Sequence, residues 1–228
     1  MASDTRPLGR VVEGFRPPPS PGPDRIEGRF VTLERLDPAR HAADLFEANR
    51  GHDAVWDCLF VGPFGTLDDY RLWQETAAKG TDPFFYALRD RRSGQVGGVA
   101  AFMRIDPAHG VIEIGNIQIA PVLQRTPASS EAIMLMIDWA CDSGYRRVEW
   151  KCNALNAASM RAAERYGFTY EGTFRQHMIV KGRNRDTAWW AITDADWKRI
   201  RAAQEQWLAP GNFDEDGRQR RSLGSFRA

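Results

Sequence analysis

The pattern of apolar and polar positions is clearest between residues 112 and 168. A β-branched run over 112–119, which Pro121 ends, predicts a strand. An almost wholly apolar segment over 132–139 predicts a helix that stops at Gly144, and a strand follows at 148–152. A second helix begins near Ala157. This order predicts a βαβα unit with parallel strands and with ligand groups at their carboxyl ends.

The remaining elements are expected on both sides of this unit. The pattern predicts strands at 28–36, 84–90, 95–105 and 110–119, and helices that begin after the capping residues Asp37 and Thr66. Strands at 169–181 and 186–193 flank a turn at 182–184, where an ion pair of Arg185 with Asp186 is expected. A helix is expected at 195–207. After Pro210 the tail is polar and arginine-rich, and we expect no secondary structure there.

The ends of the chain differ from its centre. Residues 1–25 contain the segment FRPPPSPGPDR, whose prolines favour an extended conformation. We expect an arm that is wrapped on the domain or on a partner subunit, with Phe15 as an apolar anchor; a ligand for an SH3-like module is the alternative. The expected organisation is therefore an arm at 1–25, one domain at 26–194, and a C-terminal helix with a polar tail at 195–228.

Composition limits the function classes. The 228 residues are 43% hydrophobic and 27% charged, which suits one sizeable core. A formal charge of +1 gives no overall basic field, so a nucleic-acid partner is not expected. Local arginine clusters in the tails leave RNA binding as an open alternative. No apolar run approaches the ~20 residues of a membrane span, and no signal peptide is evident, so a soluble protein is expected. The three cysteines, Cys58, Cys141 and Cys152, lack metal-ligand spacing and indicate reduced thiols in a cytoplasmic protein.

The loop at 124–130 is a candidate anion site. Free N–H groups at a helix N-terminus, together with the helix dipole and Arg125, favour a phosphate or pyrophosphate. A nucleotide-like cofactor is the natural ligand. The alternative is that Thr126, Ser129 and Ser130 only cap the helix.

A combination of motifs makes the expectation more specific. The chain has the strand EIGNIQIAP, the loop LQRTPASSEA, the strand VEWKC, the segment Asn156 to Ser159, and Gly167-Phe168 followed by Glu171-Gly172. Over roughly residues 28–196 this order resembles the GNAT superfamily of N-acetyltransferases, and more narrowly its RimJ/RimL-like branch. The resemblance implies an α/β (α+β) fold: a mixed, mostly antiparallel twisted sheet with a central parallel strand pair, flanked by helices.

The same resemblance implies a site for acetyl-CoA as co-substrate. The backbone of Asn116 to Ile119 would pair with the pantetheine arm, the loop amides would hold the pyrophosphate, and Asn156 would bind the pantetheine amides. For Asn156, a plain turn and helix cap is the alternative. The implied cofactor-binding residues are Ile117, Gln118, Ile119, Gln124, Arg125, Thr126, Ala128, Ser129, Ser130 and Asn156.

Two positions depart from the family pattern. Many GNAT enzymes have a tyrosine that protonates the leaving thiolate, but Ala163 stands at the matching position. In the resembled branch the serine of Asn-x-x-Ser is thought to contact the thiol, so Ser159 is the catalytic candidate; the alternative is a helix-face serine bonded to the backbone. The loop at 124–130 also lacks the usual glycines, which restricts how closely a ligand approaches its backbone.

The acceptor side has weaker candidates. Glu113 is expected as a base acting through water and Asn116 as an orienting group, although regular strand alternation places them on opposite faces. A bulge would bring both to one site. The alternative for Glu113 is a surface or ion-paired carboxylate. Trp56 and Phe60 are expected to line the acceptor site or, alternatively, to fill the core beneath their loop.

The sequence therefore predicts an acetyl-CoA-dependent N-acetyltransferase. Acetyl transfer from a thioester to a neutral amine, either a small molecule or a protein N-terminus, needs no enzyme nucleophile and no metal. The four scattered histidines show no metal spacing. A GNAT-fold CoA-binding module with little activity is the alternative. A homodimer is expected, because the arm, Trp197, Trp207 and the tail exceed what a monomeric core needs.

Overall fold

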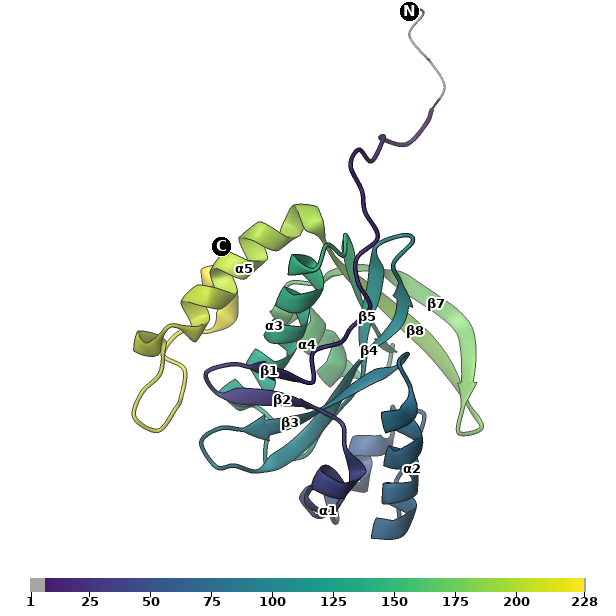
Figure 1. Ribbon diagram of the computed structural model, residues 1–228, viewed down its shortest axis with the longest axis vertical. Helices are drawn as coiled ribbons and strands as arrows, with labels where there is room; N and C mark the ends of the chain where they lie inside the picture. The colour runs from purple at the N-terminus through teal and green to yellow at the C-terminus, as the bar shows by residue number, and fades with distance from the viewer. Residues whose placement is uncertain (1–6, 228) are drawn as a thin grey trace, which may run out of the picture.

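The computed structural model describes residues 7–227 as a twisted eight-stranded sheet with helices on both faces (Figure 1). The strand order is β1-β2-β3-β4-β5-β6-β8-β7, and every neighbouring pair is antiparallel except β5 with β6. This is the mixed sheet with one parallel pair that the sequence predicts. The strands are β1 Arg25–Glu27, β2 Val31–Arg35, β3 Phe84–Asp90, β4 Val96–Asp106, β5 Val111–Ile119, β6 Arg147–Asn153, β7 Thr169–Val180 and β8 Arg183–Thr193.

The helices cover the two faces of the sheet in separate groups. Helices α1 (Pro38–Asn49) and α2 (Leu67–Lys79) pack on one face, and α3 (Pro127–Asp142), α4 (Ala157–Tyr166) and α5 (Asp194–Leu208) lie on the other. Strand β3 serves both cores: Tyr86 and Leu88 belong to the larger one and Phe85 to the smaller one. The side chains of Asp37 and Thr66 cap α1 and α2, as expected.

Strands β5 and β6 separate where the site begins. They pair in parallel only through 111–113 and 147–149, although both strands continue beyond this segment. In its pairing with β4, β5 carries one extra residue between Gly115 and Gln118, and Asn116 has a φ of +48°. This is the bulge that the sequence analysis required. The bulge turns the end of β5 away from β6 and leaves the last residues of β5 facing a groove.

The β7–β8 hairpin turns earlier than expected. Arg183 and Asn184 belong to β8, and the turn consists of Lys181 and Gly182, whose φ values are +49° and +73°. Two residues with positive φ match the twist of the flanking strands. The expected ion pair of Arg185 with Asp186 is also wrong, because Asp186 accepts from the Gln176 amide and the Asn184 side chain.

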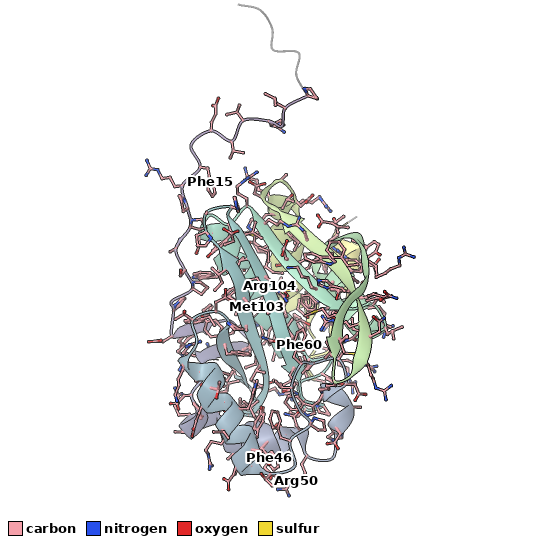
Figure 2. The ribbon with its side chains drawn as sticks, turned by 90° about the vertical axis from the view of Figure 1, so that its right-hand side faces the viewer. Phe15, Phe46, Arg50, Phe60, Met103 and Arg104 are labelled. Atoms are coloured by element: carbon pink, nitrogen blue, oxygen red, sulfur yellow. The ribbon has the colours of Figure 1, made fainter. Side chains whose placement is uncertain are left out.

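The proline-rich arm lies on its own domain from Phe15 onward, whereas residues 7–14 are exposed and extend away from it (Figure 1). The hydroxyl groups of Tyr145 and Tyr86 donate to the carbonyl oxygens of Pro19 and Pro23, at 3.0 and 2.8 Å. Phe15 sits against Gly110 at one end of the sheet (Figure 2). Residues 1–6 of the arm lie outside the described residues.

The C-terminal tail is structured, which corrects the expectation from sequence. Short 3₁₀ turns occur at Pro210–Asn212 and Leu223–Phe226, and a bridge joins Phe213 to Gln219. Leu223 is fully buried, and the Asn212 amide donates to the carbonyl oxygens of Trp207 and Arg221. The tail lies beside α5 in Figure 1.

Part of the basis for a homodimer is lost in this fold. Trp197 and Trp207, which were expected to need cover from a partner, are buried within the chain, at 7% and 2% exposure. The homodimer stays a prediction. Over residues 7–227, none of the helices combines the length and the apolar character needed to cross a membrane.

Candidate active site

The start of α3 is a capped turn with free backbone donors. Thr126 accepts a hydrogen bond from the Ser129 amide at 3.2 Å, and Pro127 occupies the first helical turn. Arg125 is exposed and adopts a φ of +61°, the left-handed conformation that glycine takes most easily. Within residues 7–227, the backbone amides of Arg125 and Ala128 have no hydrogen-bond acceptor. The turn therefore both caps its helix and presents free donors.

These donors open on a long cavity, here named the outer groove. Its walls include the end of β5, the α3 turn, the start of α4 and part of the tail, at 117–119, 124–130, 155–159 and 216–219. Arg161 and Arg165, one helical turn apart on α4, add positive charge to the same cavity. Neither these two arginines nor the tail was predicted from the sequence to line the site, although the four-residue spacing of the arginines is visible there.

Glu131, near the start of α3, has a structural role. Its carboxylate accepts hydrogen bonds from the backbone amides of Arg29, Phe30 and Val31, at 2.9, 2.6 and 3.0 Å. Gly28 leaves the space for it, since a Cβ there would lie 2.4 Å from Oε2 of Glu131. The Glu-Ala pair of the motif thus ties α3 to the β1–β2 turn.

The start of α4 brings two predicted residues together. Asn156 caps this helix by accepting a hydrogen bond from the Ser159 amide at 3.0 Å. This is the contact that the capping alternative predicts. The Ser159 hydroxyl oxygen accepts from the indole N–H of Trp150 at 2.9 Å. Because that oxygen accepts, the hydroxyl proton of Ser159 is left to donate elsewhere. Ser159 faces both the outer groove and a second, smaller cavity.

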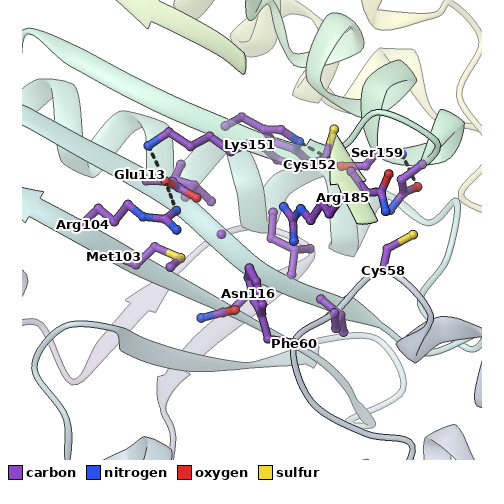
Figure 3. Close-up of a pocket in the computed structure, with 17 residues that line it drawn as sticks. Cys58, Phe60, Met103, Arg104, Glu113, Asn116, Lys151, Cys152, Ser159 and Arg185 are labelled. Carbon is purple, nitrogen blue, oxygen red and sulfur yellow. Dashed lines mark hydrogen bonds and ion pairs between the residues drawn. The ribbon is translucent and has the colours of Figure 1, made fainter. Parts of the chain in front are cut away.

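This second cavity, the inner pocket, lies where β5 and β6 separate (Figure 3). It draws side chains from β4, β5, β6 and β8 and from the loop before α2. Its walls are residues 58–60, 103–104, 113–117 and 150–153, with Asn156, Ser159 and Arg185. Both Glu113 and Asn116 line it, since the bulge overrides regular strand alternation.

Glu113 is an ion-paired carboxylate deep in the inner pocket. It is 2% exposed, and its Oε2 atom contacts Arg104 at 2.6 Å and Lys151 at 2.8 Å (Figure 3). Its Oε1 atom lies beside Gly115, where an added Cβ would be 3.0 Å away. Of the alternative that the sequence left open, a surface or ion-paired carboxylate, the ion-paired form is the one found, and one oxygen of Glu113 remains outside the ion pairs.

The charges around Glu113 form a balanced network. Lys151 also contacts Glu149 at 2.5 Å, and Arg147 contacts both Glu149 and Glu171. Burial raises the pKa of Glu149, but hydrogen bonds from Lys151 and Arg147 outweigh burial and hold the pKa below its usual value. Three cations, Arg104, Lys151 and Arg147, are thus paired with three carboxylates, those of Glu113, Glu149 and Glu171.

The position of Arg104 is set by a bulge in β4. Asp82 accepts from the backbone amides of Arg104 and Ile105, at 2.8 and 3.0 Å, where β4 shifts register against β5. Arg104 has a φ of +46° at this point. Figure 2 shows Arg104, Met103 and Phe60 gathered on one side of the molecule.

Of the two aromatic residues expected at the acceptor site, only Phe60 lines the inner pocket. Trp56 is 4% exposed and packs edge-on against Phe64 and Tyr70 in the smaller core, which is the alternative that the sequence left open. Lys181 at the hairpin tip donates to the carbonyl oxygens of Trp56 and Val61. The loop that carries Phe60 is therefore attached to β7–β8.

Comparison with known proteins decides the family. The model of the acetyltransferase (GNAT) domain matches residues 31–169, well over half of the chain. The chain belongs to the GNAT acetyltransferase family. A GCN5-related N-acetyltransferase from Brucella melitensis has 46% sequence identity with it and a TM-score of 0.92, with 95% of this chain and 99% of that chain covered.

More distant GNAT structures share the fold. A probable acetyltransferase from Chromobacterium violaceum is 38% identical with a TM-score of 0.80, covering 85% of this chain and 98% of that one. The Salmonella typhimurium enzyme that modifies the N-terminal serine of ribosomal protein L7/L12 is 21% identical with a TM-score of 0.62, covering 73% and 96%. No curated protein matches the sequence.

Acetyl-CoA is bound by a protein of this fold. The microcin C7 self-immunity acetyltransferase MccE, 22% identical with a TM-score of 0.67 over 76% of this chain and 98% of that one, was solved with acetyl-CoA and AMP. The described residues of this GNAT acetyltransferase include no cluster of three His, Cys, Asp or Glu side chains that could hold a metal. The donor set of the outer groove, free amides and arginines, fits a phosphate-bearing cofactor.

The three cysteines of this GNAT acetyltransferase are in environments that disfavour a thiolate. Burial raises the pKa of Cys58, Cys141 and Cys152, that of Cys141 to about 12. Cys58 and Cys152 line the inner pocket, whereas Cys141 lies on α3. None of the three environments activates a nucleophile.

Proposed function

We propose that this GNAT acetyltransferase transfers an acetyl group from acetyl-CoA to a primary amine by direct attack in a ternary complex. One observation carries the proposal: the outer groove and the inner pocket meet, and the residues common to both are Cys58, Ile117, Trp150, Asn156 and Ser159. A cofactor in the groove and an amine in the pocket would touch at this junction. Holding the two reactants in contact supplies much of the rate enhancement such a reaction needs.

The outer groove would hold the cofactor along its length. The backbone of Ile117, Gln118 and Ile119 would pair with the pantetheine arm, because the separation of β5 from β6 leaves this strand end without a strand partner there. The amides of the 124–130 turn would bind the pyrophosphate. The Asn156 side chain, at the junction, would bind a pantetheine amide.

At the junction, Ser159 would assist the departing thiolate. The amine nitrogen forms a bond to the thioester carbonyl carbon, the carbon–sulfur bond breaks, and the proton lost by the amine balances the proton gained by the thiolate. Because the Ser159 oxygen accepts from Trp150, its hydroxyl proton would be free to donate to this sulfur. Ser159 therefore takes the role that a tyrosine would have at Ala163.

Proton removal from the amine would pass through water to Glu113. Its Oε1 atom lies outside the two ion pairs, and Asn116 on the same pocket wall would orient the amine or the water. An acetylated enzyme is not part of the proposal, since burial disfavours the thiolate at every cysteine.

The experiment is release of free CoA thiol from acetyl-CoA with a panel of amines and N-terminal peptides. We expect turnover with at least one class of amine and no acetylated protein, by mass spectrometry, when amine is left out. An acetyl group trapped on Cys58 or Cys152 would contradict direct transfer.

One observation favours a second candidate, a CoA-binding module with little activity. Ala163 is fully buried at the position where many GNAT enzymes carry the thiolate-protonating tyrosine. Tight CoA binding in calorimetry, without thiol release for any amine of the panel, would establish the module and reject the enzyme.

A further inference from the structure

Arg185 is a buried cation in the inner pocket that the proposed chemistry does not use. It projects from β8 into the space between Glu113 and the 58–60 loop (Figure 3). The residue is 6% exposed, and its guanidinium carbon lies 4.8 Å from the centre of the Phe60 ring. The ring holds the guanidinium in place from one side through a cation–π contact.

Unlike its neighbours, Arg185 has no carboxylate partner within residues 7–227. Its Nε atom is fully enclosed and has no hydrogen-bond acceptor there. Arg104, Lys151 and Arg147 are all paired with Glu113, Glu149 or Glu171. The network is balanced without Arg185, whose charge is therefore in excess on the pocket wall.

An unpaired buried charge is costly, so its position calls for a partner. Burial lowers the pKa of Arg185, yet a guanidinium starts so far above neutral pH that it keeps its proton. Its planar set of donors matches the two oxygens of a carboxylate or a phosphate. A ligand with such a group would supply the missing charge.

We infer that the acceptor amine carries a negatively charged oxygen group, a carboxylate or a phosphate, which binds Arg185. This inference rests on the proposed function and names the class of its substrate. Arg185 and Ser159 line the same pocket, so an amine whose anionic end binds Arg185 can direct its nitrogen to the junction with the outer groove.

The experiment compares amines with and without a negatively charged oxygen group. Alanine is paired with alaninamide, O-phosphoethanolamine with ethanolamine, and the dipeptide Ser-Asp amide with Ser-Asn amide. We expect the anionic member of at least one pair to give a kcat/KM at least 10-fold higher, and the pair that responds identifies carboxylate or phosphate. Equal or better turnover of the neutral member in every pair overturns the inference while leaving the acetyltransferase function intact.

Variants then locate the effect. Arg185→Gln should raise KM for the preferred anionic amine by about 10- to 100-fold, the range of a charge-assisted hydrogen bond, and change the neutral member less than about 3-fold. Arg185→Lys should restore part of the affinity. The control is Arg183→Gln, an exposed arginine on the same strand, which should change neither value.

The thermal midpoint separates this role from a structural one. Removal of an unpaired buried charge should leave the midpoint of Arg185→Gln unchanged or higher. An equal loss of kcat for anionic and neutral amines would instead make Arg185 a donor to the thioester and contradict the inference. Absence of turnover with every amine would reject the proposed function, and this inference with it.

Discussion

The outer groove and the inner pocket meet at Ser159 but are lined by different kinds of chemical group. The groove offers main-chain amides and capping side chains from short consecutive segments, such as 124–130 and 156–159. The pocket offers charged side chains from four strands, and Arg104 and Arg185 are far apart in the sequence. A ligand that many relatives share can be held by the backbone, whereas a ligand specific to one chain needs particular side chains.

The largest effect should come from the pocket. Lys151→Met would leave Glu113 and Glu149 without the buried cation between them, and the Lys151 side chain is only 6% exposed. We expect a loss of ~3–5 kcal/mol in the free energy of unfolding, measured by urea titration. Lys198→Met, an exposed lysine on α5, is the matched control and should change stability by less than about 0.5 kcal/mol. A loss no larger than that of the control would mean that the network is solvated.

The next effect tests the junction itself. Ser159→Ala removes the hydroxyl group that we propose assists the leaving sulfur, and one such donor is worth ~2–4 kcal/mol in the transition state. We expect kcat to fall by ~10²-fold while the acetyl-CoA affinity in calorimetry changes much less. Thermal unfolding checks that the Trp150 indole, deprived of its acceptor, has not disturbed the fold. A fall in affinity that matches the fall in kcat would assign Ser159 to cofactor binding.

The smallest effect should come from the groove, because its donors are mainly backbone groups. Arg125→Glu reverses an exposed charge beside the turn and should weaken CoA binding by about 10-fold without loss of stability. Arg175→Glu, an exposed arginine on β7, serves as the control in the same calorimetric titration. Unchanged CoA affinity in Arg125→Glu would place the pyrophosphate away from this turn.

The same contrast explains what the sequence could predict. The caps Asp37 and Thr66, the strands around them and the turn at 124–130 depend on neighbours within a few residues, and they occur where expected. Local patterning and motif order together are enough for this part of the fold, including the parallel pairing of β5 with β6.

What the sequence missed depends on contacts between distant segments. The tail looks polar, yet Phe213 and Leu223 bury themselves against the domain. For Trp56 the sequence left both the acceptor site and the core open, and only its contacts with Phe64 and Trp73 decide for the core. The sequence suggests that Arg185 follows a turn and pairs with Asp186, and only the placement of β8 beside β6 brings Arg185 to the pocket. Residue type and spacing along the chain do not indicate which distant segments come into contact.

The link between Glu131 and the β1–β2 turn has a consequence for the order of events during synthesis. The three amides at 29–31 find their acceptor about 100 residues later in the chain. At ~5–20 residues per second, the ribosome delivers that carboxylate roughly 5–20 s after the turn itself. Until then the backbone amides of the β1–β2 turn lack their carboxylate acceptor. The N-terminal edge of the sheet should therefore form late, after α3 has been made.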